Sequence, residues 1–320
     1  MGKHDNLNKA RNKKNDEFYT RLEDVEKELD HYKHHFKDKI VYCNCDDPVR
    51  SVFWEYFHLN FKELELKRLI STYYDKDNPV YKTIYEGGND EDITVGIKTV
   101  LEGNGDFRSK ECTEILKDAD IIVDNPPFSL SRTSYIPQLF KYHKKFLIIG
   151  DLNWITYKTI FPLLKNNSMW FGYNNVTEFK QPDGTTKKFG NKVWFTNLDI
   201  DKRHKNISLK KKYSENEYTK YANYDGINIS KVSQIPCDYD GVMGVPITFM
   251  SQYNPDQFEI IGLGIANLGL ECGVKPYKPH HKKYRKEVQK KGQVDGDLYM
   301  VDKDDHPVVP YARILIRKKQ

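Results

Sequence analysis

The stretch "ADIIVDNPPFS", residues 119–129, decides how this chain is interpreted. Its apolar run Ile121-Ile122-Val123 predicts a buried strand, and Asp124-Asn125-Pro126-Pro127-Phe128 ends that strand abruptly. Two consecutive prolines cannot continue a central strand, because neither has an N–H to donate. In open parallel sheets, ligands bind beyond the carboxyl ends of the strands. The stiff corner at 124–128 is therefore the first candidate for a functional site.

Strands and helices alternate on both sides of this corner. Apolar runs predict further strands at 39–45, 66–72 and 145–150. Amphipathic or capped segments predict helices at 20–36, 47–57, 109–119, 134–143 and 156–166. Thr20 with Glu23 matches a capping box, and Asp47-Pro48 matches a helix start. The alternation predicts βαβ units, and so an α/β fold with a Rossmann-like parallel sheet and helices on both faces.

The pattern changes after residue 166. Strand-like runs at 168–173 and 191–198 flank a loop with proline and glycine, which predicts a β-hairpin added to the sheet. From about residue 200 the sequence becomes polar and basic, with isolated strand candidates at 258–264 and 312–319. We therefore predict one domain over 1–200 and a C-terminal α+β region over 201–320.

Composition narrows the class of protein. The 320 residues carry a net charge of +5, with 30% charged side chains, and no apolar run approaches the ~20 residues that a membrane helix needs. The polar N-terminus does not resemble a signal peptide. Five cysteines without a CxxC pair predict reduced thiols and a cytoplasmic protein. The 22 Tyr, 16 Phe and 4 Trp reflect either codon bias or faces for stacking on nucleic-acid bases.

The corner also suggests a chemistry. Its prolines can hold the Asn125 side-chain oxygen and the Pro126 carbonyl so that both face one way, while Pro127 stiffens the bend. Two fixed acceptors match the two hydrogens of an exocyclic amine, and Phe128 can stack on the ring that carries it. A methyl sulfonium such as S-adenosylmethionine would be a suitable electrophile. The simpler interpretation is a rigid loop that only ends the strand.

The sequence also resembles a known family. The corner is similar to the (D/N/S)-P-P-(Y/F/W) motif of amino methyltransferases, and residues 13–320 resemble the EcoRI-type adenine-specific DNA methyltransferases. Further matching stretches include "NDEFYT" (15–20), "VYCNCDDP" (41–48), "FLIIGDLNWITYKTIF" (146–161) and "YDGVMGVPITFM" (239–250). The resemblance implies an enzyme that methylates N6 of adenine in double-stranded DNA with S-adenosylmethionine and flips the base out to reach it. It also implies that 201–320 reads the target sequence. A cognate restriction endonuclease as functional partner, an orphan modification enzyme, a monomer and a dimer all stay open.

The resemblance further implies site residues. Those expected to grip the target base are Asn125, Pro126, Pro127 and Phe128. Those expected to bind the cofactor are Phe18, Tyr19, Thr20, Tyr42, Cys43, Asn44, Asp46, Asp47, Asp106, Phe107, Asp124 and Asn125. Asp75 is a candidate partner of the ribose hydroxyls. The turn "CNCDDP" lacks the glycines that usually follow the first strand of such folds, so a backbone cradle cannot be assumed there.

Several alternatives stay open. Thr20 can serve only as a helix cap, Asp106 only as a solvated turn residue, and Cys43 with Cys45 only as packing. His31 and His35 have metal-ligand spacing but lack a third ligand, so no metal is expected. The basic segments 202–212 and 275–286 suit phosphate contacts or solvated surface. As for function, a methyltransferase of RNA or protein glutamine and a catalytically inert DNA-binding relative remain alternatives.

Overall fold

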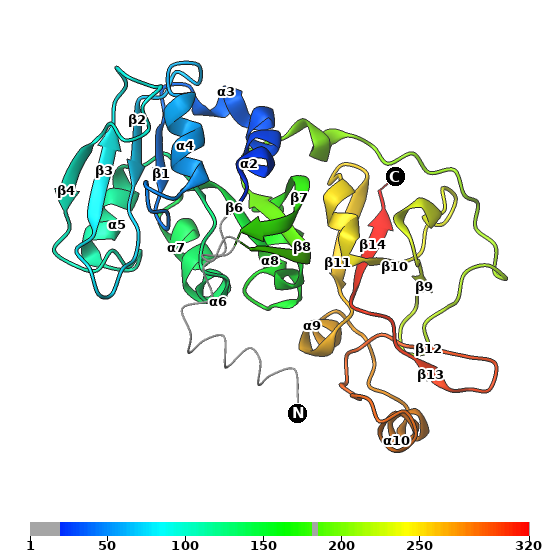
Figure 1. The fold of residues 1–320 in the computed structure, drawn as a ribbon. Coiled ribbons are helices and arrows are strands. Elements are labelled where there is room, and N and C mark those ends of the chain that lie inside the picture. Colours follow the sequence, from blue (N-terminus) through cyan, green and yellow to red (C-terminus); the bar gives the residue numbers. More distant parts are fainter. Residues whose placement is uncertain (1–19, 181–184, 320) are drawn as a thin grey trace. The chain divides into compact units, whose positions relative to one another are not determined.

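The computed structural model describes residues 20–180 and 185–319, so Phe18 and Tyr19 lie outside the described part (Figure 1). The chain divides into two compact units. The first comprises the described residues up to 152 together with 169–200, and the second comprises 153–168 and the residues from 201 on. We describe each unit separately.

The first unit is built on an eight-stranded sheet. Its strands are β1 (Ile40–Cys43), β2 (Arg68–Ser71), β3 (Tyr81–Tyr85), β4 (Ile97–Val100), β5 (Ile121–Asp124), β6 (Lys145–Asp151), β7 (Trp170–Lys180) and β8 (Thr186–Thr196). Their order in the sheet is β4-β3-β2-β1-β5-β6-β8-β7. Neighbours from β2 to β6 pair in parallel, while β3, β4, β8 and β7 pair antiparallel. The prediction of an α/β fold with a parallel core is confirmed.

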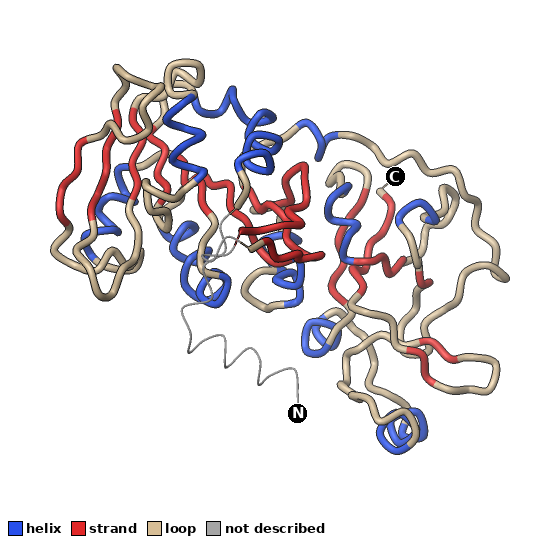
Figure 2. The backbone as a smooth tube through the Cα atoms, viewed as in Figure 1, coloured by secondary structure: helices blue, strands red, loops and turns tan. Residues whose placement is uncertain are grey.

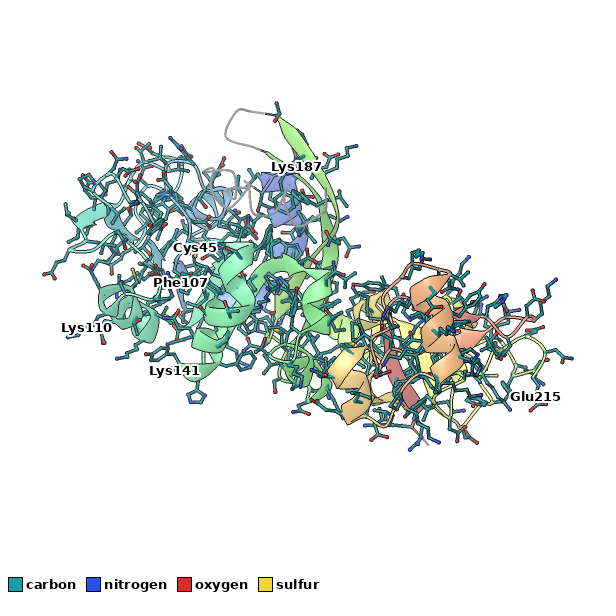
Figure 3. All side chains as sticks on the ribbon, turned by 90° about the horizontal axis from the view of Figure 1, so that it is seen from below. Cys45, Phe107, Lys110, Lys141, Lys187 and Glu215 are labelled. Carbon is teal, nitrogen blue, oxygen red and sulfur yellow. The ribbon has the colours of Figure 1, made fainter. Side chains whose placement is uncertain are left out.

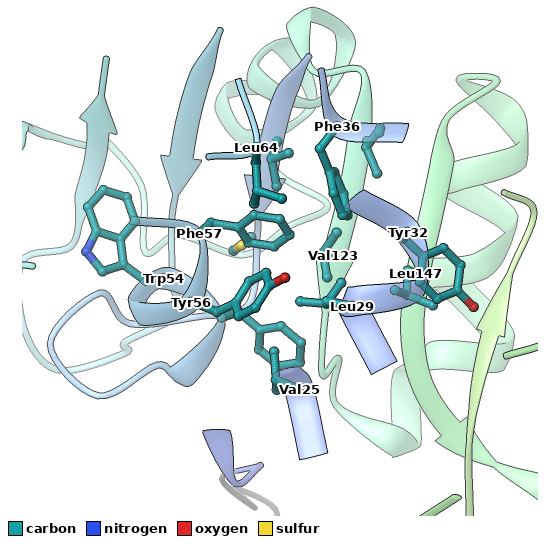
Figure 4. Close-up of a cluster of buried hydrophobic side chains, with 14 of the residues drawn as sticks. Val25, Leu29, Tyr32, Phe36, Trp54, Tyr56, Phe57, Leu64, Val123 and Leu147 are labelled. Atoms are coloured by element: carbon teal, nitrogen blue, oxygen red, sulfur yellow. The ribbon is translucent and has the colours of Figure 1, made fainter. Parts of the chain in front are cut away.

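Helices cover both faces of this sheet (Figure 1). The helices of the unit are α2 (Leu22–Leu29), α3 (Lys33–Phe36), α4 (Val52–Leu59), α5 (Lys110–Asp118), α6 (Phe128–Leu130) and α7 (Ile136–Lys141). Alternate residues of the central strands, such as Val123 and Leu147, pack with α2 and α4 in a large aromatic core (Figure 4). Tyr42 points to the opposite face, where it interacts with Cys112 of α5. Because successive side chains of a strand point to opposite faces of the sheet, these apolar strands present an apolar surface to each helical layer.

A buried carboxylate ties the hairpin β7–β8 to α2. Glu28 accepts hydrogen bonds from the backbone N–H of Tyr173 (2.7 Å) and Asn174 (2.8 Å) and from the Tyr32 hydroxyl (2.9 Å). Gly172 passes so close that a Cβ there would lie 2.1 Å from Glu28 Oε1. Burial raises the pKa of Glu28, and the hydrogen bonds oppose that shift. This contact fixes the position of the hairpin on the sheet.

Three details differ from the sequence predictions. The helix predicted at 47–57 begins only at Val52, because Ser51 is extended and its Oγ accepts from Phe53 N (3.1 Å) and Trp54 N (3.3 Å). Asp47 instead closes a separate turn, in which its carbonyl accepts from Ser51 N (2.8 Å). The helix α2 begins after Arg21 without a side-chain cap, so the capping role of Thr20 is wrong.

The second unit contains a four-stranded sheet of order β11-β14-β10-β9 and a short hairpin. Its strands are β9 (Ile227–Asn228), β10 (Met243–Pro246), β11 (Phe258–Leu263), β12 (Met300–Val301), β13 (Pro307–Val308) and β14 (Arg313–Lys318). Its helices are α8 (Phe161–Lys165), α9 (Ala266–Glu271) and α10 (Pro279–Glu287), with short 3-10 segments at Asp201–His204, Val232–Gln234 and Ile247–Gln252. Long loops connect them (Figure 2). The helix predicted at 156–166 is confined to α8.

The short segment 153–168 is held to the second unit by polar contacts. Lys165 donates to the carbonyl of Ile261 (2.7 Å), and Lys158 pairs with Glu271 (2.6 Å). Across the part of the chain that the structure describes, no helix is both long and apolar enough to span a bilayer.

Candidate active site

A cavity of about 480 Å³ opens in the first unit beyond the carboxyl ends of β1, β2 and β5. Its walls come from the turn after β1, the residues after β2, the loop before α5, and the corner after β5. Cys45 and Phe107, labelled in Figure 3, line the cavity from the first and third of these segments. Four separate chain segments thus meet where an open parallel sheet binds ligands.

The turn after β1 is held by polar bonds rather than by glycines. Ser71 Oγ donates to the carbonyl of Asp46, and Asp46 N donates to the carbonyl of Thr72 (3.0 Å). These bonds fasten the turn to the end of β2. They explain how a turn without a glycine can present the side chains of Asn44, Asp46 and Asp47 to the cavity.

Asp46 provides a carboxylate with unused hydrogen-bonding capacity. Its Oδ2 is buried and has no hydrogen-bond partner among the described residues. Burial and the nearby Asp124 raise the pKa of Asp46 well above its usual value, against a hydrogen bond from Ser51. A buried oxygen without a donor is costly, so the site favours a ligand that brings a donor or a positive charge.

Thr20 presents a second polar atom of this kind. It lines the same cavity, its residue is 3% exposed, and its Oγ1 has no hydrogen-bond partner in the described part of the chain. Since Thr20 does not cap α2, its buried hydroxyl has no structural use in this state. The hydroxyl therefore remains available to a ligand.

Beneath the cavity, Asp124 belongs to a buried network. Tyr135 Oη lies 2.9 Å from Asp124 Oδ2 and also contacts Asn44 Oδ1. A phenol has one hydrogen and cannot donate to both oxygens. The network is satisfied if Asp124 keeps a proton and donates it to Tyr135, or if the Asn44 amide is turned so that its NH₂ donates. Burial raises the pKa of Asp124, which agrees with the first arrangement.

The loop before α5 forms the opposite wall. Gly105 has φ +74°, and a Cβ there would lie 1.8 Å from the carbonyl oxygen of Tyr73, so only glycine fits. Asp106 forms two short contacts with Arg108, Nε–Oδ1 at 2.9 Å and Nη2–Oδ2 at 2.6 Å, and this guanidinium lowers the pKa of Asp106. Phe107 is buried and meets Tyr135 edge-on at 5.0 Å.

The corner after β5 is locked on both sides. Asn125 N donates to Asp124 Oδ1 (2.8 Å), while the Pro127 carbonyl accepts from Leu130 N (3.0 Å) and Ser131 Oγ (2.7 Å). The prolines therefore lead directly into α6. Asn125 Oδ1 is buried, and Asn125, Pro126, Pro127 and Phe128 all line the cavity. The corner after β5 and the unpartnered oxygens of Asp46 and Thr20 thus share one cavity.

The structure brings together most of the predicted site residues. Those that line the cavity are Thr20, Asn44, Asp46, Asp47, Asp75, Asp106, Phe107, Asn125, Pro126, Pro127 and Phe128. Tyr42, Cys43 and Asp124 lie in the strands beneath it and are fully buried. Asp75 Oδ1 accepts from Asp77 N (2.8 Å) and Asn78 N (3.1 Å), so its carboxylate helps to shape its own loop.

Sequence reasoning missed other lining residues. These are Cys45, Arg50, Ser51, Val52, Phe53, Tyr73, Tyr74, Gly105, Arg108 and Leu130. Tyr73 and Tyr74 directly follow the predicted strand 66–72, so their place at its carboxyl end was a usable signal. Together the walls offer aromatic faces, a carboxylate and a buried hydroxyl. This set fits an elongated ligand that carries both a flat ring and a positive charge.

Comparisons with known proteins identify the family of the chain. The family model described as adenine-specific methyltransferase EcoRI matches residues 6–319. The chain is 43% identical to Type II methyltransferase M.EcoRI of Escherichia coli, over 98% of this chain and 96% of that protein. It is 36% identical to Type II methyltransferase M.MgeORF184P of Mycoplasma genitalium, over 98% and 99%. It is 35% identical to Type II methyltransferase M.MpnI of Mycoplasma pneumoniae, over 85% and 86%. No solved structure gives a significant match.

Proposed function

The chain belongs to the EcoRI family of adenine-specific methyltransferases, and from that premise we propose that its cavity binds S-adenosylmethionine and that its corner presents N6 of a flipped-out adenine in duplex DNA. The observation that carries this proposal is the shared cavity. Asn125, Pro126 and Phe128 open into the same space as the unsatisfied oxygen of Asp46 and the unsatisfied hydroxyl of Thr20.

The residues present suit the cofactor. Asp46 and Thr20 can accept hydrogen bonds from its ammonium group, and Phe107 with Tyr73 and Tyr74 can border its adenine ring. The Asp106 carboxylate would have to contact that ring and keep its ion pair with Arg108 at the same time. When bound, the cofactor supplies a methyl group already activated by its sulfonium charge.

The corner would act on the amine by geometry and electrostatics. The Asn125 side-chain oxygen and the Pro126 carbonyl would each accept one N6 hydrogen, which would draw the nitrogen toward a tetrahedral geometry and localise its lone pair for attack on the methyl group. Phe128 would stack on the base and hold that plane. Flipping the base costs a few kcal/mol, which stacking and phosphate contacts offset.

The second unit would supply the DNA contacts and read the target sequence. The segment 275–286 places Lys275, Lys278, Lys283 and Lys286 at the surface, and 210–212 adds three exposed lysines. Two other cations there are used internally, since Lys282 pairs with Asp295 (2.6 Å) and Arg285 donates to the Gly292 carbonyl. Exposed lysines suit contacts with the phosphates of a duplex, where charge supplies much of the affinity.

The test is a methyl-transfer assay with isotopically labelled S-adenosylmethionine on duplex DNA, RNA and protein extract in parallel. We expect label only in duplex DNA, as N6-methyldeoxyadenosine after digestion to nucleosides. Asn125→Ala should abolish transfer, with cofactor and DNA binding largely retained. Label in RNA or protein alone, or full activity in Asn125→Ala, would overturn the proposal. Long-read sequencing of DNA from expressing cells would then give the methylated sequence.

A further inference from the structure

One buried cation has no part in the function described so far. Lys192 lies on β8 in the first unit, and its side chain is 6% exposed. Its ammonium stands 4.5 Å from the ring centroid of Phe128, the aromatic residue of the corner, and 5.0 Å from that of Phe189. A lysine is rarely buried unless it is paired, so its position calls for an explanation.

The pairing partner is Asp151, at the end of β6. Lys192 and Asp151 are direct cross-strand neighbours in the antiparallel β6–β8 ladder, and Lys192 Nζ lies 2.7 Å from Asp151 Oδ2. Asn191 Nδ2 donates to the other carboxylate oxygen at 2.8 Å. Because strand register fixes both Cα positions, the ammonium has a defined place beside the corner. The stretch 146–161, one of those quoted for the family resemblance, supplies this carboxylate.

Phe128 is also bordered by aromatic rings. The Phe179 ring contacts two other rings edge-on. Its centroid lies 6.3 Å from that of Phe128 and 5.5 Å from that of Phe189. The ammonium therefore faces the rings of both Phe128 and Phe189, and Phe179 packs between these two rings. A cation over a ring face is attracted by the ring quadrupole, and the attraction grows where water is excluded. This arrangement restricts both the tilt and the position of the Phe128 ring.

Stability alone does not explain such a pair. Removing two charges from water costs several kcal/mol, and apolar residues of similar volume are often as stabilising or more so. The hairpin already has an anchor in Glu28, which bonds the β7 backbone. What the Lys192–Asp151 pair adds is a fixed charge against the ring that is expected to stack on the target base.

We propose that Lys192, held by Asp151, is a positioning residue that fixes the Phe128 ring for stacking on the flipped base. The inference rests on the proposed function of the corner. Without the ammonium, Phe128 would keep its hydrophobic contacts but sample more orientations, so the amine would reach its two acceptors less often. Lys192 does not line the cavity proposed for the cofactor, so binding of the cofactor would be unaffected.

The test compares Lys192→Met, which keeps an unbranched side chain only one atom shorter and removes the charge, with Lys192→Arg, which keeps a cation. We expect Lys192→Met to lower kcat by about tenfold, and Lys192→Arg by no more than about threefold, since Arg also binds ring faces. Cofactor affinity should be unchanged. Lys188→Met is the matched control on the same strand, because the Lys188 side chain is 82% exposed. Its kcat should equal that of the unmodified protein.

Two readouts separate positioning from a merely structural role. In the double variant with Phe128→Ala, the loss should be no greater than in Phe128→Ala alone, because Lys192 acts through that ring. With 2-aminopurine at the methylated position, Lys192→Met should give brighter emission than the unmodified protein, since a less ordered ring quenches less. Should Lys192→Met not fold, Asp151→Asn takes its place in both readouts, with the same expectations.

The inference fails if Lys192→Met retains wild-type kcat, or if its loss multiplies fully with that of Phe128→Ala. It also fails if the 2-aminopurine emission is unchanged. Absence of any methyl transfer to DNA by the unmodified protein would instead overturn the proposed function. The two failures are therefore distinguishable.

Discussion

Replacing Gly105 by alanine would test whether the loop before α5 shapes the cavity that we propose binds the cofactor. The residue has φ +74°, and the new Cβ would lie 1.8 Å from the Tyr73 carbonyl oxygen and 2.9 Å from its carbon. Both atoms belong to the backbone, so no flexible side chain can move aside. Either the loop keeps its position under strain, or it moves and takes Asp106 and Phe107 out of the wall.

The magnitude follows from two contributions. A left-handed backbone costs a residue with a Cβ about 1–2 kcal/mol. The overlap adds about 1–3 kcal/mol, the usual cost of overpacking. The sum, about 2–5 kcal/mol, will divide between the free energy of unfolding and the free energy of cofactor binding. If the whole lower value falls on binding, the Kd for S-adenosylmethionine rises by about 30-fold.

The assay pairs isothermal titration with S-adenosylmethionine and denaturant unfolding of the same samples. Gly103→Ala is the control, because it lies two residues away and the nearest atom to its Cβ is 4.0 Å distant. Gly103→Ala should change neither quantity appreciably. If Gly105→Ala leaves both the Kd and the unfolding free energy at wild-type values, the described geometry of this wall is wrong.

Two further predictions concern the anchor of the hairpin and the charge of the cavity. Gly172→Ala should lower the free energy of unfolding by about 3 kcal/mol, because the new Cβ displaces Glu28 from its hydrogen bonds. Gly190→Ala, in the same hairpin with no atom within 4 Å of its Cβ, should keep the unfolding free energy of the wild type. Equal unfolding free energies for the two variants would refute this anchor. Because burial raises the pKa of Asp46, its carboxyl takes up a proton as the pH falls through that raised value. Calorimetry at decreasing pH should therefore show weakening affinity for the cationic cofactor, and Asp46→Asn should bind weakly with a flatter pH profile; an equally steep profile in the variant would exclude Asp46 as the titrating group.

The parallel centre of the sheet was predictable because its strands are buried on both faces. Ile121–Asp124 and Lys145–Asp151 read as continuous apolar runs, and such runs carry a strong signal. The strand β4 was not predicted, although its four residues, Ile97-Lys98-Thr99-Val100, include two β-branched apolar side chains; all four are exposed, so the strand contributes little to the core. Edge strands of this kind are defined by their pairing with a neighbour, which a single sequence does not show.

The site was predictable where local sequence fixes local geometry. The corner at 124–128 needs only its prolines, and it lies where expected. Thr20 shows the opposite case. Its capping-box spacing predicted a helix cap, but the structure places Thr20 in the wall of the cavity instead. The part played by Gly105 depends on the approach of Tyr73, more than thirty positions earlier in the chain, which spacing cannot reveal. Lys192 likewise gains its meaning only through strand register.

The central claim is that the methyl donor and the amine-gripping corner share one cavity. A crystal structure with bound S-adenosylmethionine tests it most directly. We predict electron density for the donor against Asp46, Thr20 and Phe107, with its sulfonium beside Asn125 and Pro126. Density at any place outside the walls of this cavity would contradict the account.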